Sequence, residues 1–473
     1  MWLNGRQMVN ALDCRVVVHP VLGDARIEKI VWDSREIGPG CAFLAIKGEN
    51  VDGNSFIAEA IEKGALFAIA TAEPDEAAVG AARMRKAGIV VVDDAEAAMH
   101  QMADYVRGRM DATVVGVTGS SGKTTTKNMV ARVLSSQFET VKTEGNQNNE
   151  LGVPSTVLSC GVRTEMLVVE MGMRGLGQIE ALCRFVRPHI GVITNIGTAH
   201  EELLGSQDNI ARAKAELVAA LPPSEGIAVL NGDDPFTPAV CEYGGVRERG
   251  VKVITFGESV GCAVRALNVE LSADGRPSFD IAFPQGRTGH VDLPLVGRHN
   301  VMNALAAAAV GVACDIPMEK ICNALKRVEG QSMRLEVVDG KDGVKVLNDT
   351  YNANPDSMRA ALAVLESMQA SGRKVAVLGD MGELGTEERA MHRAVGEAAA
   401  AAGVDCLVTV GELAREMAAG AMDAGLEASK VVECGDAEAA LVTLPGILMP
   451  GDVVLVKASR FMELERIVKG LVD

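Results

Sequence analysis

Apolar residues fall in short continuous runs along this chain, and the runs predict buried β-strands. Each run is rich in Val, Ile and Leu and ends at a Gly, Asp, Thr or Ser. Continuous runs of this kind are typical of strands that are covered on both faces of a parallel sheet. We expect strands at residues 112–119, 166–172, 189–197, 374–380, 405–411 and 451–459.

The segments between these runs carry apolar residues at helical spacing. The clearest are AEAAMHQMADYVRGRM at 95–110, TKNMVARVLSSQ at 126–137 and MRAALAVLESMQAS at 358–371. Strands that alternate with amphipathic helices predict an α/β fold with mostly parallel sheets. The stretch 259–296 differs, because its apolar and polar residues alternate around Gly turns, and it favours an antiparallel patch.

Length and pattern together predict three parts. A chain of 473 residues is long enough for about three domains. One boundary is expected near residue 110, where a helical pattern gives way to a strand, and another at EGQSMR, residues 329–334. The expected domains are therefore 1–110, 111–331 and 332–473.

Charge and composition exclude several classes of protein. The net charge is −17, from 46 basic and 63 acidic side chains, and aromatic residues make up 3%. This argues against a protein that coats nucleic acid or an anionic membrane, although it leaves room for a local phosphate pocket. No apolar stretch reaches about 20 residues, so no membrane-spanning helix is expected.

Two further features predict a cytoplasmic protein. The first 20 residues lack the basic start and long apolar core of a secretory signal. The ten cysteines are scattered and none forms a C-x-x-C pair. We expect reduced, mostly buried thiols and neither a disulfide framework nor a zinc site.

The strongest local signal is VVGVTGSSGKTTTK at 114–127, a strand that runs into a Gly/Ser loop and then a helix. Backbone N–H groups of such a loop, with the helix N-terminus, bind phosphate oxygens. Lys123 would reach the β- and γ-phosphates, and the hydroxyl of Thr124 or Thr125 would bind Mg²⁺. The spacing is the shorter form T-G-x-x-G-K-[ST], made by Thr118, Gly119, Ser120, Ser121, Gly122, Lys123 and Thr124.

The pattern indicates a nucleoside triphosphate and Mg²⁺; the alternative is a Gly-rich turn without a ligand. Three further residues are candidates for the chemistry. Glu170 ends a predicted strand, where a carboxylate would face the ligand crevice of a parallel sheet and could bind Mg²⁺. His200 follows the next strand. Lys214 lies on a predicted helix. The alternatives are a solvated Glu, a structural His and an ordinary solvated helix lysine.

Taken in order, these motifs resemble the Mur ligase family, the ATP-dependent amide-forming enzymes that assemble peptidoglycan precursors. The resemblance covers essentially the whole chain. The matching segments are WDSREIGPGCAFLAIKGENVDGNSFI (32–57), TGSSGKTTTK (118–127), GNQNNELGVP (145–154), EMGMRGLGQI (170–179), TNIGTAHEELLGS (194–206), AKAELV (213–218), GRHNVMNALAAAAV (297–310), MRLEVV (333–338), NDTYNANPDSM (348–358), GDMGELG (379–385) and GDVVLVKASR (451–460).

The resemblance implies a reaction and a ligand for each part. The last two segments are typical of family members that join D-Ala-D-Ala to UDP-MurNAc-tripeptide through an acyl phosphate, which supports cell-wall synthesis, cell shape and division. The D-N-P-R motif of members that add diaminopimelate is absent. The implied architecture is a UDP-sugar-binding α/β domain, a central P-loop domain and a Rossmann-like domain for the dipeptide and part of ATP.

The resemblance also implies roles for individual residues. ATP with two Mg²⁺ ions is expected, together with carbamoylation of Lys214 by CO₂, and the enzyme is expected to be a monomer. Catalytic roles fall on Lys123, Glu170, His200 and Lys214, and metal binding on Thr124, Thr125, Glu170, His200 and Lys214. Nucleotide contacts fall on the phosphate loop and on Asn300, Asn303, Arg334, Asp349 and Tyr351. Substrate contacts fall on Ser34, Arg35, Lys47, Gly48, Asn148, Asn149, Lys457, Ser459 and Arg460.

Two other functions remain open at this stage. The first is another Mur-type ligase, one that adds a single amino acid or resembles folylpolyglutamate synthetase. The second is an NTP-driven switch or motor that acts on a protein partner. The UDP-domain motif at 32–57 argues against the second, and the segments NDTYNANPDSM and GDMGELG argue against the first.

Overall fold

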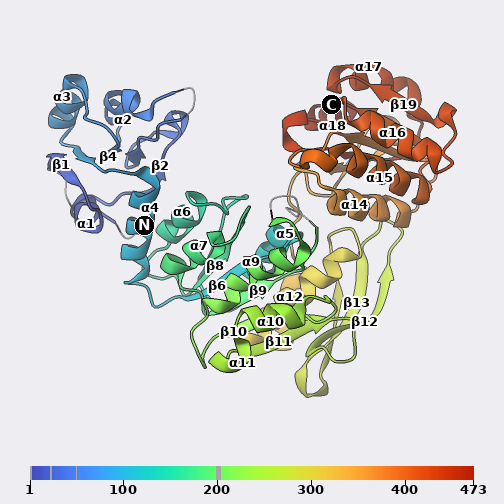
Figure 1. Cartoon of the computed structure of the whole chain (residues 1–473), viewed down its shortest axis with the longest axis horizontal. Coiled ribbons are helices and arrows are strands. Elements are labelled where there is room, and N and C mark those ends of the chain that lie inside the picture. Colours follow the sequence, from blue (N-terminus) through green and yellow to red (C-terminus); the bar gives the residue numbers. More distant parts are fainter. Residues whose placement is uncertain (1–2, 22–23, 49–50, 199–203, 473) are drawn as a thin grey trace.

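The computed structural model describes residues 3–21, 24–48, 51–198 and 204–472. They form three β-sheets that follow one another along the chain, each with helices against it. Figure 1 shows the amino-terminal and carboxyl-terminal parts on opposite sides of the middle part. The boundaries predicted at residues 110/111 and 331/332 each fall between the last strand of one sheet and the first of the next.

The amino-terminal sheet has five strands in the order β1-β5-β4-β3-β2. Strands β2 to β5 are parallel neighbours, and β1 pairs with β5 in the antiparallel sense. The carboxyl ends of β2, β3 and β4 therefore meet at one edge. The strands are β1 (Arg15–Val18), β2 (Ile30–Val31), β3 (Ala42–Leu44), β4 (Phe67–Ala70) and β5 (Gly88–Val91).

The middle sheet has nine strands in the order β14-β13-β12-β11-β10-β9-β6-β8-β7. Strands β6 to β12 are parallel, and β12, β13 and β14 form the antiparallel patch that the sequence predicts. The strands are β6 (Thr113–Thr118), β7 (Thr140–Lys142), β8 (Met166–Glu170), β9 (Ile190–Ile193), β10 (Ile227–Asn231), β11 (Lys252–Gly257), β12 (Val264–Leu271), β13 (Pro277–Ala282) and β14 (Thr288–Asp292).

The carboxyl-terminal sheet has six strands in the order β15-β16-β20-β17-β18-β19. All are parallel except β15, which pairs with β16 in the antiparallel sense. Its strand pattern is the Rossmann-like one that was expected. The strands are β15 (Glu336–Asp339), β16 (Lys345–Asp349), β17 (Lys374–Gly379), β18 (Cys406–Val410), β19 (Val431–Cys434) and β20 (Val453–Lys457).

The helices cover the faces of these sheets, as expected for α/β architecture. Every strand and helix segment predicted from the sequence is present, with ends that shift by a few residues. The helices are α1 (Gly5–Ala11), α2 (Ile57–Glu62), α3 (Glu76–Arg85), α4 (Ala95–Arg107), α5 (Lys123–Leu134), α6 (Gly152–Ser159), α7 (Gln178–Val186), α9 (Gln207–Ala219), α10 (Thr237–Tyr243), α11 (Val246–Arg249), α12 (His299–Ala313), α13 (Met318–Leu325), α14 (Pro355–Ser367), α15 (Glu388–Ala401), α16 (Ala414–Asp423), α17 (Ala437–Ile447) and α18 (Glu465–Val472).

The amino-terminal and middle parts share one apolar core. Helix α4 packs against α6 and α7 of the middle part, and buried residues of both parts belong to one cluster. The buried guanidinium of Arg107 at the end of α4 donates to the carbonyls of Val186 and Arg187 at the end of α7. On the other side, Val296 of the middle part belongs to the core cluster of the carboxyl-terminal part.

Two expectations about the whole chain can be compared with the structure. Across the described part of the chain, no helix is long and apolar enough to cross a membrane. All ten cysteines are free thiols, and Cys41, Cys160, Cys183, Cys322, Cys406 and Cys434 are buried. Burial raises the pKa of the Cys160 and Cys183 thiols to about 12. These thiols therefore stay protonated and behave as small apolar groups.

Candidate functional site

A cavity of about 1830 Å³ lies between the middle and carboxyl-terminal parts. On the middle side it opens at the carboxyl ends of β6, β8 and β9, which are adjacent in the sheet. The chain leaves β6 into α5 and continues to β7, which lies beyond β8, whereas β9 lies on the other side of β6. Ligands of parallel α/β sheets bind at such a reversal of strand order.

The loop between β6 and α5 has the conformation that a phosphate loop needs. Gly119 and Gly122 have φ of 151° and 74°, values that side chains disfavour. A Cβ on Gly119 would lie 1.8 Å from Oγ1 of Thr194, and a Cβ on Gly122 would lie 2.5 Å from Oδ1 of Asn303. Both positions require glycine, because a strand and a helix close on the loop from either side.

Lys123 begins α5 and folds back over the loop. Its Nζ donates to the carbonyls of Gly119 at 2.8 Å and Ser120 at 3.3 Å. Burial lowers the pKa of Lys123, and Arg334 lowers it further against the opposing effect of Glu170. Among the described residues, the hydrogen-bond acceptors of this ammonium are neutral carbonyls, so an incoming phosphate can attract it away from them.

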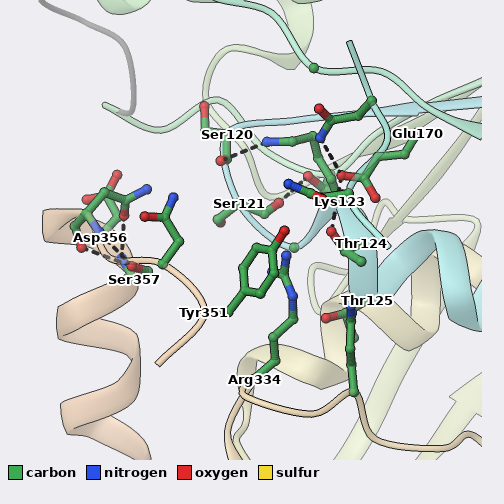
Figure 2. Close-up of a pocket in the computed structure, with 18 of the residues that line it drawn as sticks. Ser120, Ser121, Lys123, Thr124, Thr125, Glu170, Arg334, Tyr351, Asp356 and Ser357 are labelled. Atoms are coloured by element: carbon green, nitrogen blue, oxygen red, sulfur yellow. Dashed lines mark hydrogen bonds between the residues drawn. The ribbon is translucent and has the colours of Figure 1, made fainter. Parts of the chain in front are cut away.

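Glu170 is the last residue of β8 and is only 1% exposed. Its Oε1 accepts hydrogen bonds from Oγ1 of Thr124 at 3.1 Å and from Nδ2 of Asn148 at 2.8 Å. The alternative of a solvated strand-end carboxylate is therefore wrong. Figure 2 shows Glu170 directed at Thr124 and Lys123.

Lys127, for which the sequence predicts no role, lies opposite Glu170. Both side chains are 1% exposed, and Nζ of Lys127 lies 3.8 Å from Oε2 of Glu170. Nζ also donates to the carbonyls of Thr143 at 2.6 Å and Gly145 at 3.1 Å. Burial lowers the pKa of Lys127 to about 8, against the opposing effect of Glu170.

The donors around Glu170 suit Mg²⁺. Oε2 of Glu170 is buried and accepts no hydrogen bond from any described residue, and the hydroxyl of Thr124 lies beside the other oxygen. These are hard oxygen donors. Over the described residues, no group of three or more His, Cys, Asp and Glu side chains is placed to hold a metal. Mg²⁺ needs no such cage when substrate phosphates and water complete its shell.

The remaining predicted catalytic residues are His200 and Lys214. His200 lies outside the described residues. Lys214 lies on α9 and is 2% exposed, so the alternative of an ordinary solvated helix lysine is wrong. Burial lowers the pKa of Lys214 well below its usual value, and the nearby Lys123 lowers it further. This amine is therefore disposed to be neutral and nucleophilic.

The predicted nucleotide residues of the middle part lie at the start of α12. Nδ2 of Asn303 donates to Oδ1 of Asn300 at 2.8 Å, and Oγ1 of Thr126 donates to Oδ1 of Asn303 at 3.1 Å. Asn300 in turn donates to the carbonyl of Val296. Both asparagines line the cavity, and Asn303 closes one side of the phosphate loop.

The carboxyl-terminal part brings Arg334 and Tyr351 to the same cavity. The guanidinium carbon of Arg334 lies 4.1 Å from the centroid of the Tyr351 ring, and Nε of Arg334 is buried and makes no hydrogen bond with any described residue. Figure 2 shows both side chains reaching toward the phosphate loop. Residues of both parts therefore line one cavity.

Asp349 and Lys457 form a buried ion pair at the carboxyl ends of the paired strands β16 and β20. Nζ of Lys457 lies 2.5 Å from Oδ2 of Asp349 and also donates to the carbonyl of Asn352 at 2.9 Å. The backbone N–H of Leu335 donates to Oδ1 of Asp349. Both charged groups therefore already have protein partners at the wall of the cavity.

The remaining predicted substrate residues near the cavity have mixed positions. Ser459 is buried, and its hydroxyl accepts from the N–H of Gly382 at 2.9 Å. Arg460 is exposed and pairs with Glu465 at 2.6 Å. Oδ1 of Asn149 accepts from the N–H of Gly152, the first residue of α6, at 3.0 Å. All of these except Gly152 and Glu465 line the cavity.

The predicted substrate residues of the amino-terminal part lie away from this cavity. Ser34 and Arg35 follow β2, and Lys47 and Gly48 follow β3, so all four lie at one edge of the first sheet. Arg35 is exposed and pairs with Asp33 at 2.5 Å. Lys47 and Asp52 form an isolated antiparallel β-bridge.

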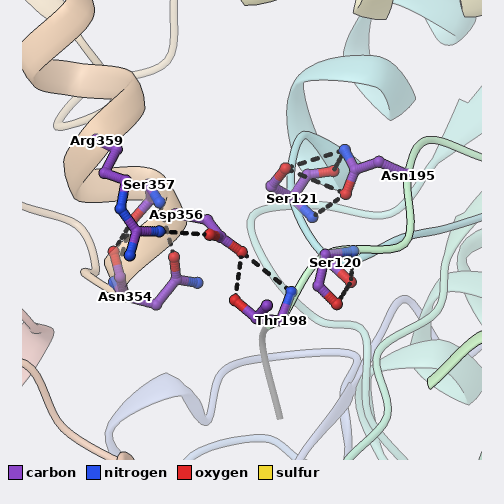
Figure 3. Close-up of polar contacts among 9 residues, drawn as sticks. Ser120, Ser121, Asn195, Thr198, Asn354, Asp356, Ser357 and Arg359 are labelled. Atoms are coloured by element: carbon purple, nitrogen blue, oxygen red, sulfur yellow. Dashed lines mark hydrogen bonds and ion pairs between the residues drawn. The ribbon is translucent and has the colours of Figure 1, made fainter. Parts of the chain in front are cut away.

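Two residues that line the cavity, Asn195 and Asp356, also carry no role predicted from the sequence. Oδ1 of Asn195 accepts from the N–H of Ser121 at 3.0 Å and fixes the phosphate loop to the end of β9. Asp356, at the start of α14, contacts the middle part (Figure 3). Asn195 could have been found by the signal that identified Glu170, a polar residue at a strand's carboxyl end. Nothing local marks Asp356 or Lys127, whose partners are distant in sequence.

Comparison with protein-family models covers most of the chain. Residues 26–107 match the model described as Mur ligase family, catalytic domain. Residues 117–311 match the Mur ligase middle domain, and residues 333–460 match the Mur ligase, glutamate ligase domain.

Individual relatives give the same picture. A UDP-N-acetylmuramoyl-tripeptide–D-alanyl-D-alanine ligase of Bacillus subtilis is 35% identical over 97% of this chain and 96% of its own. A crystal structure of MurF from Acinetobacter baumannii is 34% identical, with a TM-score of 0.86 over 99% of this chain and 98% of the other. MurF ligase from Thermotoga maritima, in complex with ADP, is 28% identical, with a TM-score of 0.78 over 94% and 97%.

Proposed function

The chain belongs to the Mur ligase family, and from this premise we propose that it joins D-Ala-D-Ala to UDP-MurNAc-tripeptide with hydrolysis of ATP to ADP and phosphate. The product is UDP-MurNAc-pentapeptide for peptidoglycan synthesis. One observation carries the chemistry: Lys123, Thr124 and Glu170 of the middle part and Arg334 of the carboxyl-terminal part line one cavity. The identity of the two substrates rests on the relatives.

The phosphate loop begins the reaction. Backbone N–H groups from 119 to 123 and the N-terminus of α5 would bind the ATP phosphates. Lys123 would leave the carbonyls of Gly119 and Ser120 and contact the γ-phosphate, where its charge offsets the charge that moves to the leaving oxygen. The tripeptide carboxylate attacks the γ-phosphorus, ADP leaves, and an acyl phosphate forms.

Metal binding follows from the donors on this edge of the sheet. Glu170 with Thr124 or Thr125 would hold Mg²⁺, which supplies positive charge at the transferring phosphoryl group. Carbamoylation of Lys214 would provide a second anionic ligand. The neutral amine forms an N–C bond with CO₂ and releases one proton to solvent, which leaves a carbamate. The burial and lowered pKa of Lys214 support this step, because only the unprotonated amine reacts.

The second half of the reaction needs the carboxyl-terminal part. The dipeptide amine attacks the acyl carbon, a tetrahedral intermediate forms, phosphate leaves and the nitrogen loses its proton. The candidates for holding the dipeptide lie at the carboxyl end of β20 and are Lys457, Ser459 and Arg460. Lys457 already pairs with Asp349. The cavity between the two parts would exclude water, which would otherwise hydrolyse the acyl phosphate.

The UDP group is assigned to the first sheet. Ser34, Arg35, Lys47 and Gly48 lie together at one edge, where parallel sheets bind ligands. Trp32 lies at the end of β2, two residues before Ser34. UDP-MurNAc-tripeptide should therefore change the tryptophan emission of a Trp2→Phe variant. Unchanged emission under saturating substrate would place the UDP group elsewhere.

Both walls of the cavity come from one chain, so a monomer would be sufficient for activity. ATP and the UDP-linked substrate would be used in the cytoplasm.

The decisive experiment measures phosphate release by the purified protein with each muramyl precursor and each acceptor. Release that needs both UDP-MurNAc-tripeptide and D-Ala-D-Ala supports the proposal. Release with UDP-MurNAc-dipeptide and a free amino acid would instead indicate a ligase for the third residue. ATP turnover that requires neither substrate would favour an NTP-driven switch.

A further inference from the structure

Asp356 joins the carboxyl-terminal part to the middle part within the cavity. Its Oδ2 accepts a hydrogen bond from the backbone N of Thr198 at 3.1 Å and another from Oγ1 of Thr198 at 2.8 Å. Its Oδ1 accepts from Nη1 of Arg359, one turn along α14, at 3.0 Å. Figure 3 shows the carboxylate between Arg359 on one side and Thr198 on the other.

The Thr198 side of this contact leads directly to the phosphate loop. The N–H of Gly197 donates to Oγ of Ser120 at 2.9 Å, and the N–H of Ser120 donates to the carbonyl of Asn195 at 3.0 Å. A Cβ on Gly197 would lie 3.0 Å from Oδ2 of Asp356 and 3.2 Å from Cβ of Ser120. Gly197 is therefore held between the phosphate loop and Asp356.

The Asp356 side of the contact is fixed by the start of α14. Asn354 caps the helix, because its Oδ1 accepts from the N–H of Ser357 at 2.8 Å while Oγ of Ser357 accepts from the N–H of Asn354 at 3.0 Å. Pro355 occupies the first helical position, where its fixed φ favours the helix. The position of the Asp356 carboxylate is therefore fixed by α14, which packs against β17 and β20.

We propose that Asp356 is a positioning residue that holds the carboxyl-terminal part in register with the phosphate loop through Thr198, Gly197 and Ser120. Its importance for activity rests on the proposed function; its importance for the arrangement of the two parts does not. As a positioning residue, Asp356 would act without contact to the reacting atoms. It acts by keeping Arg334 and Tyr351 opposite Lys123, so that both halves of the nucleotide site are assembled.

The KM for ATP should depend on the fraction of enzyme molecules in which the two parts are assembled. If the contact favours the assembled arrangement, its loss lowers the fraction of free enzyme that can bind nucleotide, and apparent affinity falls by that fraction. Once substrates bridge the cavity they hold it together themselves. Loss of Asp356 should therefore raise the KM for ATP about 3- to 10-fold and leave kcat within about twofold.

The test compares four variants of the whole chain. Asp356→Ala removes all three hydrogen bonds, and Thr198→Val removes only the hydroxyl bond from the other side. Arg359→Ala removes a partner of the same carboxylate without touching the middle part. Glu438→Ala removes an exposed first-turn acid from α17, which controls for the general effect of acids at helix N-termini.

Two readouts are needed, and the first is independent of activity. Hydrogen exchange of the peptide that contains the Thr198 amide should be about fivefold faster in Asp356→Ala and unchanged in Arg359→Ala and Glu438→Ala. The KM for ATP should rise in Asp356→Ala and less in Thr198→Val. Asp356→Asn keeps one acceptor oxygen, so its hydrogen exchange and its KM for ATP should lie between those of Asp356→Ala and the unmodified protein.

Different results would contradict the positioning role of Asp356 and the proposed function. If the unmodified protein releases phosphate as proposed but Asp356→Ala and Thr198→Val match it in exchange and in KM, the positioning role is wrong. A fall in kcat alone, with exchange unchanged, also overturns it. If the unmodified protein does not turn over the two substrates, the proposed function fails, and hydrogen exchange still decides the contact. Should Asp356→Ala not fold, Thr198→Val carries the test.

Discussion

Nζ of Lys127 lies 3.8 Å from Oε2 of Glu170, and solvent reaches 1% of either side chain. The two residues lie on different elements, α5 and β8, 43 positions apart in the sequence (170 − 127). Lys127 neutralises the carboxylate proposed to hold Mg²⁺, while the carbonyls of Thr143 and Gly145 occupy two of its hydrogens. A buried carboxylate without this neighbour would be costly.

We therefore predict that Lys127→Met destabilises the protein by about 3 kcal/mol or more, because removal of one partner leaves a buried charge unpaired. Mg²⁺ with ADP should restore part of the loss, since the metal replaces the missing positive charge. Thermal unfolding with and without Mg²⁺ and ADP measures both effects. The control is Lys142→Met on β7, whose Nζ donates to Oδ1 of Asn128 and to no other residue that the structure describes. Equal losses in the two variants would contradict a special role for the Lys127–Glu170 pair.

The two loop glycines should tolerate no side chain. Gly119→Ala places a Cβ 1.8 Å from Oγ1 of Thr194, and Gly122→Ala places one 2.5 Å from Oδ1 of Asn303, both at positive φ. We expect each to weaken ADP binding at least about 10-fold, with the greater loss at Gly119, because the loop must move to accept the methyl group. Titration calorimetry measures this. Gly177→Ala, where φ is 81° but no atom lies within 4 Å, separates clash from backbone strain.

Lys214 should be needed for activity and not for folding. Lys214→Met removes the proposed carbamate and its metal contact, so phosphate release should fall at least about 100-fold. Its thermal stability should be unchanged or higher, because a buried amine is replaced by an apolar side chain of similar length. Incubation with ¹³C-bicarbonate should give a carbamate NMR signal in the unmodified protein alone. Full activity in Lys214→Met would contradict the proposed role of a carbamate on Lys214.

Lys457 was predicted to contact the dipeptide, and its pairing with Asp349 suggests a different effect of mutation. Lys457→Met leaves the carboxylate of Asp349 half of a broken buried pair, so we expect a stability loss of about 3 kcal/mol. The KM for D-Ala-D-Ala, measured on the folded fraction, should change less than about twofold. A large rise in that KM with unchanged thermal stability would instead support a contact between Lys457 and the dipeptide.

Much of this protein is determined by local sequence. Continuous apolar runs predicted strands such as β6, β8 and β20, because a strand covered on both faces has no polar side to interrupt it. The alternating stretch 259–296 predicted the antiparallel patch. The phosphate loop could be identified from its residues alone, because Gly119, Gly122 and Lys123 act within a few positions of one another.

Residues whose roles depend on distant partners could not be predicted in the same way. The sequence marks Glu170 as a strand-end carboxylate, but only the tertiary structure shows that it is buried and faces Lys127. It likewise leaves Lys214 as one of several helix lysines, until packing of α9 against the sheet buries it. Burial and pairing are properties of the assembled sheet, because they depend on which segments the strand order brings together.

The cavity is the clearest case of this division. The sequence by itself determined that the chain has a phosphate loop, an α/β fold and the motifs of its family. The tertiary structure decided that Arg334 and Tyr351 lie opposite that loop, and that Asp356 meets Thr198 across 158 positions of sequence. The physical reason is range: strand, helix and loop preferences act over a few residues, whereas a hydrogen bond between two sheets exists only after both have folded and docked.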